Sequence, residues 1–65
     1  MQIVLNGKPC EVAQARLDGV LQELGYHEAK VATAVNGDFV ARPARAATAL
    51  KEGDQVEVIA PMQGG

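Results

Sequence analysis

The sequence predicts an α+β domain: a mixed sheet of about five strands with one helix packed on one face. Three observations favour this class. Two Asn-Gly pairs, at residues 6–7 and 36–37, are each flanked by short runs of branched apolar residues, as in β-hairpins. An apolar stripe at helical spacing lies between these two hairpins. A last alternating segment, over residues 55–60, supplies one more strand.

The first hairpin combines a strand over residues 2–5 with a return strand over 8–12. The Asn-Gly pair between them tolerates the positive φ angles of a type I′ turn. Because Pro9 has no backbone N–H, its strand is expected at an edge of the sheet. Cys10 and Val12 share one face of that strand. A free cysteine there is most simply a small apolar residue, because nothing in the sequence supplies the electropositive setting of a reactive thiol.

The helix is predicted over residues 17–25. Its apolar residues recur at i, i+3, i+4 and i+7: Leu17, Val20, Leu21 and Leu24. Gly25 provides the left-handed residue that commonly ends a helix. No Ser or Thr stands at the expected start, so Asp18 is expected to contribute part of the N-terminal cap.

The second half of the chain predicts a strand over 31–35, a strand starting at 38–40, a loop with a helical turn over 42–50, a turn at 52–54 and a strand over 55–60. Val56 and Val58 fall on one face of the last strand, and Pro61 is expected to end it. The acidic residues Glu52, Asp54 and Glu57 are interpreted as a solvated face, with contact to a basic partner surface as the alternative.

One helix covers one face of a sheet, so the other face must be polar or must meet a partner. Val4, Phe39 and Ile59 are the candidates for an exposed apolar patch on that face, which would bind partner proteins.

Composition narrows the function classes. The 65 residues suffice for one domain, and the formal net charge of −2 argues against a nucleic-acid binder. No segment approaches the roughly 20 apolar residues that span a bilayer, so no membrane association is expected. The start of the chain shows no signal-peptide pattern, and a single Cys suits a reducing compartment, so a cytoplasmic location is expected.

Motifs of catalysis and cofactor binding do not stand out. The glycines match neither the phosphate-binding loop G-x-x-x-x-G-K-[ST] nor G-x-G-x-x-G. No His/Cys cluster suggests a metal, and His27, which is the only His, is interpreted as a connector residue. A chain of this size has little room for converging catalytic groups. We therefore expect a protein that is not an enzyme and binds no cofactor of its own.

The remaining feature is the end of the sequence. Residues 1–60 are predicted to form the domain and residues 61–65 a flexible tail, which contains Met62 and Gln63 and finishes with Gly64 and Gly65. Glycines without Cβ atoms can enter a narrow channel and adopt strained dihedral angles. Such a tail can deliver a terminal carboxylate into the active site of another protein.

Several motifs along the chain resemble one family. The motifs are Ala32 to Gly37, Phe39 to Arg42, Leu50 to Val58, and the final Gly64-Gly65. Their order and spacing, together with the leucine-rich helix, resemble the thiamine-biosynthesis sulfur carriers (ThiS-like proteins), which belong to the MoaD/ThiS superfamily of the β-grasp, ubiquitin-like fold. Two positions depart from the family pattern: Ala41 stands where Pro is frequent, and Arg16 where Thr or Ser often starts the helix.

The resemblance implies a protein co-substrate. An E1-like adenylyltransferase (ThiF-like) would use ATP and Mg²⁺ to convert the Gly65 carboxylate into an acyl-adenylate. A sulfur donor such as an enzyme persulfide would displace AMP and leave a thiocarboxylate. Thiazole synthase (ThiG-like) would then take the sulfur for the thiazole of thiamine. Gly64, Gln63 and Met62 would bind these partners.

Three other functions stay open from the sequence. The molybdopterin-synthase small subunit shares the fold and the tail chemistry, although its chains are usually longer and richer in aromatic residues. The second alternative is a sulfur carrier that delivers its sulfur to a different acceptor. The third is a ubiquitin-like interaction module whose C-terminal carboxylate never reacts.

Overall fold

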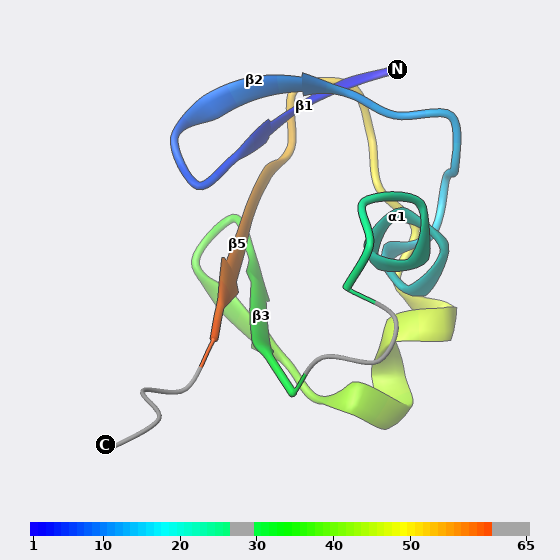
Figure 1. Ribbon diagram of the computed structural model, residues 1–65, viewed down its shortest axis with the longest axis vertical. Coiled ribbons are helices and arrows are strands. Elements are labelled where there is room, and N and C mark those ends of the chain that lie inside the picture. The colour runs from blue at the N-terminus through cyan, green and yellow to red at the C-terminus, as the bar shows by residue number, and fades with distance from the viewer. Residues whose placement is uncertain (27–29, 61–65) are drawn as a thin grey trace.

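The computed structural model describes residues 1–26 and 30–60, which form one mixed sheet and two helices (Figure 1). In chain order, the elements are β1 (Gln2–Leu5), β2 (Lys8–Glu11), α1 (Leu17–Glu23), β3 (Ala32–Val35), β4 (Asp38–Val40), the 3₁₀ helix η1 (Arg42–Ala47) and β5 (Gln55–Ile59). The strand order is β2-β1-β5-β3-β4, so β5 is the central strand. It pairs parallel to β1 and antiparallel to β3.

The two hairpins form as the Asn-Gly pairs predict. Asn6 and Gly7 have φ angles of 49° and 85°, and Asn36 and Gly37 have 51° and 89°. Positive φ at both turn residues gives the turn the same twist as the strands that it joins. The edge position predicted from Pro9 is also confirmed, because β2 is the outermost strand next to β1.

Helix α1 ends as the glycine predicts, although the regular part stops at Glu23. Gly25 has φ 92°. The N–H of Tyr26 donates to the carbonyl of Leu21 at 2.8 Å, and the N–H of Gly25 donates to that of Gln22 at 3.1 Å. These two bonds are the pair that defines a Schellman motif.

The start of α1 is held partly by Asp18, whose Oδ1 accepts the N–H of Gly19 at 2.8 Å. Arg16, at the cap position, makes no side-chain capping bond. Instead its segment pairs with the chain after η1, where the N–H of Leu17 donates to the carbonyl of Thr48 at 2.9 Å. Tertiary pairing therefore fixes the start of the helix in place of a Ser or Thr cap.

The core lies between α1 and one face of the sheet. Its buried apolar side chains come from both layers and from the connecting segments: Ile3, Val12, Leu17, Val20, Leu21, Leu50, Val56 and Val58. Helices α1 and η1 lie on the same side of the sheet (Figure 1). Cys10 is half-buried and packs against this core, as expected of a small apolar residue.

The predicted loop with a helical turn is the six-residue 3₁₀ helix η1. Its Arg45 is buried, which the sequence did not indicate. The Arg45 Nε donates to Thr33 Oγ1 at 3.1 Å, and Nη2 donates to the carbonyl of Val31 at 2.7 Å. The arginine thereby ties η1 to the start of β3.

The prediction of a solvated acidic face is wrong for one of its three members. Glu52 and Glu57 are exposed, whereas Asp54 is buried. Its Oδ2 accepts the N–H of Lys51 at 2.8 Å. A carboxylate that closes the turn before β5 in this way is a structural group and not part of a charged surface.

Candidate functional site

The sheet face opposite α1 carries the residues predicted to bind partners. Alternation along the strands turns Val56 and Val58 toward the helix, so their neighbours in β5 point to the other face. By the same alternation and the cross-strand register, Val4 and Phe39 also point to that face. We call it the outer face.

Phe39 and Ile59 dominate the exposed apolar surface of the outer face. Their side chains are 72% and 62% exposed. Phe39 pairs with Ala34 across β4 and β3, and Ile59 pairs with Ala32 across β5 and β3. Alanine side chains are too short to cover their larger neighbours. These four residues, two large and two small, form one apolar surface that we call the outer patch.

Val4 does not belong to the outer patch, which corrects the prediction of a single cluster of three. It is half-buried and lies opposite Gln55 in β5. Gln55 and Ile59 are four residues apart along the same strand, which corresponds to about 13 Å. Exposed Glu57 stands between them. The register, which the sequence left uncertain, thus places Val4 at the opposite end of the face.

The strand that carries Ile59 is fixed on the β1 side by a turn residue. The backbone N–H of Asn6 donates to the carbonyl of Val56 at 2.9 Å, and beyond that bond the side chain of Asn6 continues the pairing with β5. Asn6 Oδ1 accepts the N–H of Val58 at 2.9 Å, and its Nδ2 donates to the carbonyl of Val58 at 3.1 Å. The amide side chain therefore acts as one more residue of a neighbouring strand.

A second turn residue fixes the start of β5 from the β3 side. The N–H of Gln55 donates to Asn36 Oδ1 at 2.9 Å, and Asn36 Nδ2 donates to Asp54 Oδ1 at 3.1 Å. The hydrogen bond from the backbone of Lys51, followed by the one from Asn36, lowers the pKa of Asp54 below its ordinary value and outweighs the opposing effect of burial. Sequence reasoning found both asparagines as turn residues only, because their contacts with β5 depend on tertiary pairing.

Four of the predicted site residues, Met62, Gln63, Gly64 and Gly65, lie outside the described residues, as does His27. Within residues 1–26 and 30–60, no three His, Cys, Asp or Glu side chains are grouped so that they could hold a metal ion. No helix in this described part is long and apolar enough to cross a membrane. The site that the structure does describe consists of the outer patch and the strand β5 that the two asparagines hold.

A mixed sheet of order β2-β1-β5-β3-β4 with one α-helix across one face is the β-grasp architecture, the class of ubiquitin-like domains. A family model described as the ThiS family matches residues 3–65. The chain belongs to the ThiS family.

Two solved structures of one protein support this assignment. The crystal structure of the thiamine biosynthesis protein ThiS from Geobacter metallireducens is 36% identical, with a TM-score of 0.83 and full coverage of both chains. A solution structure of a thiamine biosynthesis protein from the same organism is 35% identical, with a TM-score of 0.80, and the match covers all of this chain and 88% of that one. The fold predicted from the sequence is thus confirmed.

A thiazole synthase from Magnetococcus marinus is 41% identical over 66 residues. The match covers the whole of this chain but only 20% of that protein, so the chain spans about a fifth of the length of this curated relative.

Proposed function

We propose that this chain is a sulfur carrier protein of thiamine biosynthesis whose working group is the carboxylate of Gly65. The observation that carries the proposal is the ThiS family match, which extends from residue 3 to residue 65 and so includes the two final glycines. The likeness to the Geobacter ThiS protein over the whole chain supports the same role.

The chemistry needs activation because a carboxylate is a poor electrophile. In the proposed sequence, an E1-like adenylyltransferase binds ATP and Mg²⁺. A carboxylate oxygen of Gly65 attacks the α-phosphorus of ATP, and pyrophosphate leaves. In the resulting acyl-adenylate AMP is a good leaving group, and the terminal sulfur of a persulfide donor displaces it to form an acyl disulfide. A thiol then attacks the donor's own sulfur in that acyl disulfide, which releases the Gly65 thiocarboxylate and leaves a disulfide on the donor.

The proposed acceptor enzyme is a thiazole synthase, which takes the sulfur into the thiazole ring. The similarity between this chain and a stretch of the Magnetococcus thiazole synthase supports that partner. The ThiS family match favours it over molybdopterin synthase, the nearest alternative from the sequence. The carrier itself contributes a recognisable body and a positioned reactive end, so proximity is its share of the catalysis.

The outer patch is the surface proposed to meet these partners. Exposed apolar side chains that gather on one face mark interaction sites. Phe39 and Ile59 lie on β4 and β5, and Ile59 stands six residues before Gly65 in the sequence. A partner that takes up residues 62–65 would meet the outer patch first, while Val4 would be reached only by a partner that spans the sheet.

Mass spectrometry of the protein from cells that make thiamine tests the proposal. A thiocarboxylate adds about 16 Da, because sulfur replaces oxygen at the last residue. A purified activating enzyme should also catalyse ATP–pyrophosphate exchange in the presence of the chain, and a variant without Gly65 should abolish it while keeping the fold. Exchange that persists without Gly65, or a last residue that is never modified, would contradict the proposal.

A further inference from the structure

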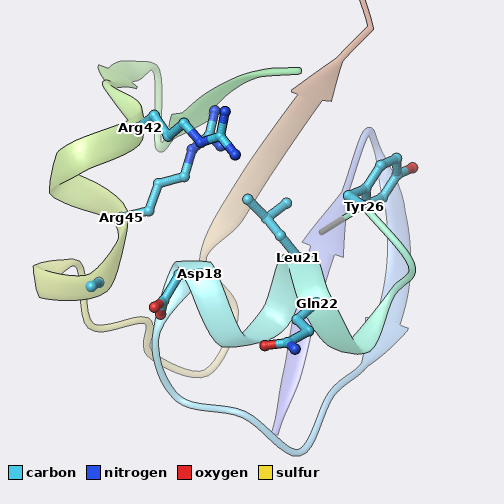
Figure 2. Close-up of a pocket in the computed structure, with 7 residues that line it drawn as sticks. Asp18, Leu21, Gln22, Tyr26, Arg42 and Arg45 are labelled. Atoms are coloured by element: carbon cyan, nitrogen blue, oxygen red, sulfur yellow. The ribbon is translucent and has the colours of Figure 1, made fainter. Parts of the chain in front are cut away.

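A pocket of about 300 Å³ lies between α1 and η1, on the side of the sheet opposite the outer patch. Leu21 and Tyr26 line it from the helix side, and Arg42 and Arg45 from η1 (Figure 2). Asp18, at the start of α1, also faces the pocket. The pocket contains none of the residues that the proposed function needs, so a test of the pocket does not depend on that function.

The two arginines share one side of η1 because of its geometry. A 3₁₀ helix has three residues per turn, so side chains three residues apart lie one above the other. Arg42 and Arg45 are three apart in η1, and Figure 2 shows their side chains extending in the same direction. Two like charges on one side of a short helix repel each other, and an anion placed between them relieves that repulsion.

Arg45 lines this pocket from a buried position that hydrogen bonds fix. It is only 9% exposed, and its Nε and Nη2 groups donate to neutral oxygens of Thr33 and Val31. The hydroxyl of Thr33 is itself fixed, because it donates to the carbonyl of Val40 at 2.8 Å. Among the residues that the structure describes, no acidic side chain forms an ion pair with Arg45. Because these acceptors are neutral, they do not offset the positive charge of the guanidinium.

Asp18 reduces the positive charge of the pocket lining but does not neutralise it. Two guanidinium groups and one carboxylate leave the lining with a net charge of +1. The Asp18 carboxylate is partly engaged, since its Oδ1 accepts the N–H of Gly19. The lining therefore favours an anion, and the position of Asp18 limits how strongly it does so.

We infer that this pocket binds a small dianionic oxyanion of the phosphate type between Arg42 and Arg45. The planar fork of a guanidinium matches the oxygens of phosphate, and two such groups favour a dianion over a monocarboxylate. The volume is at the low end for ligand pockets, which suits a small ion. Leu21 and Tyr26 form an apolar wall that lowers the local dielectric constant and strengthens the attraction.

The test is an NMR titration of the full ¹⁵N-labelled chain with inorganic phosphate at pH 7.5 and constant ionic strength. Saturable shifts are expected at the amides of three residues that line the pocket, Leu21, Tyr26 and Ala46, with weaker binding of acetate. Arg42→Gln should weaken phosphate binding by at least about tenfold, because it removes a charged hydrogen-bonding partner. Lys8→Gln, which removes the same charge from exposed β2, is the matched control and should leave the affinity unchanged. Asp18→Asn should tighten binding several-fold.

Glu28 is the first acidic residue after Tyr26 in the sequence, and its carboxylate could compete with phosphate for the arginines. The titration is therefore repeated with Glu28→Gln present in every protein. Shifts that stay linear in both backgrounds would overturn the site. So would equal losses in Arg42→Gln and Lys8→Gln, acetate binding as tight as phosphate, or weaker binding in Asp18→Asn.

Discussion

Asn6 holds Val58 by both ends of its side-chain amide, although the two residues are far apart in the sequence. One bond of 2.9 Å runs from the Val58 N–H to Oδ1, and one of 3.1 Å runs from Nδ2 to the Val58 carbonyl. The same asparagine makes the first hairpin turn with φ 49°. One residue thus ends β1 and extends the pairing of β5, the strand that leads toward the proposed reactive end.

Two substitutions at Asn6 separate these two roles. Asn6→Gly keeps the positive φ and loses both amide bonds, so it should destabilise the fold by about 1–2 kcal/mol. Asn6→Ala also places a Cβ-bearing residue without a local hydrogen bond in the left-handed region, which should cost about 1 kcal/mol more. Urea denaturation measures both, with exposed Lys8→Ala in the same hairpin as the control. An Asn6→Gly variant as stable as the unsubstituted chain would show that the amide contacts contribute nothing.

Acid should weaken the start of β5 through Asp54. Its pKa is lowered in the folded state, while in the unfolded chain it is about 3.9. Below about pH 5 the unfolded state therefore binds more protons than the folded state, and stability falls as the pH drops through the folded pKa. The Asp54 contribution is fully present above that window.

Asp54→Asn isolates the contribution of Asp54 to the pH dependence of stability, because the substitution removes the titrating group. The variant should be less stable at pH 7 and should lose less stability between pH 5 and pH 3 than the unsubstituted chain. Urea denaturation at a series of pH values supplies both curves, and other carboxylates cancel in their difference. Parallel curves would mean that Asp54 titrates alike in both states.

The sequence was sufficient where structure is decided locally. The Asn-Gly turns, the apolar stripe of α1 and its glycine end depend on residues close together in the chain, and all of them appear in the structure. Pro9 at the edge follows equally directly from its missing N–H.

What the sequence missed depends on pairing between distant segments. The parallel contact of β1 with β5 places Val4 beside Gln55 and away from Ile59, and no local pattern fixes that register. The burial of Asp54 and of Arg45 likewise follows from partners supplied by other elements, Asn36 and Thr33. Charged residues in a polar stretch are normally exposed, so their patterns gave no sign of burial.

The outer patch should affect partner recognition more than stability. Phe39→Ala and Ile59→Ala remove mostly exposed side chains, so each should change the free energy of unfolding by no more than about 0.5 kcal/mol. Each should raise the KM of the activating enzyme for this chain by about tenfold, the effect of losing roughly 1.4 kcal/mol of binding. Steady-state ATP–pyrophosphate exchange gives the KM. Gln2→Ala, at an exposed position in β1, is the control, and an unchanged KM in both patch variants would exclude the patch from this contact.

Cys10 should not take part in sulfur transfer. It is half-buried against the core, on the face of the sheet opposite the outer patch. Cys10→Ser should therefore form the Gly65 thiocarboxylate at a rate within about twofold of the unsubstituted chain, with a stability loss of about 1 kcal/mol from the hydroxyl that replaces the thiol beside apolar groups. Mass spectrometry after incubation with ATP, the activating enzyme and a sulfur donor follows the product. A folded variant that forms none would assign the thiol a direct role.

Gly64 tests whether the reactive end must enter a narrow channel. Gly64→Val adds a branched side chain that restricts φ and ψ and widens the segment just before the reacting carboxylate. Because Gly64 lies outside the core elements of the sequence, the free energy of unfolding should stay within about 0.5 kcal/mol, while adenylation falls by at least about a hundredfold through the loss of correct orientation. Gly64→Ala adds only a Cβ atom, so its adenylation rate should lie between those of the unsubstituted chain and Gly64→Val. The three rates should therefore follow side-chain size. Equal adenylation of all three proteins would show that the partner site is wide and that the glycine serves another purpose.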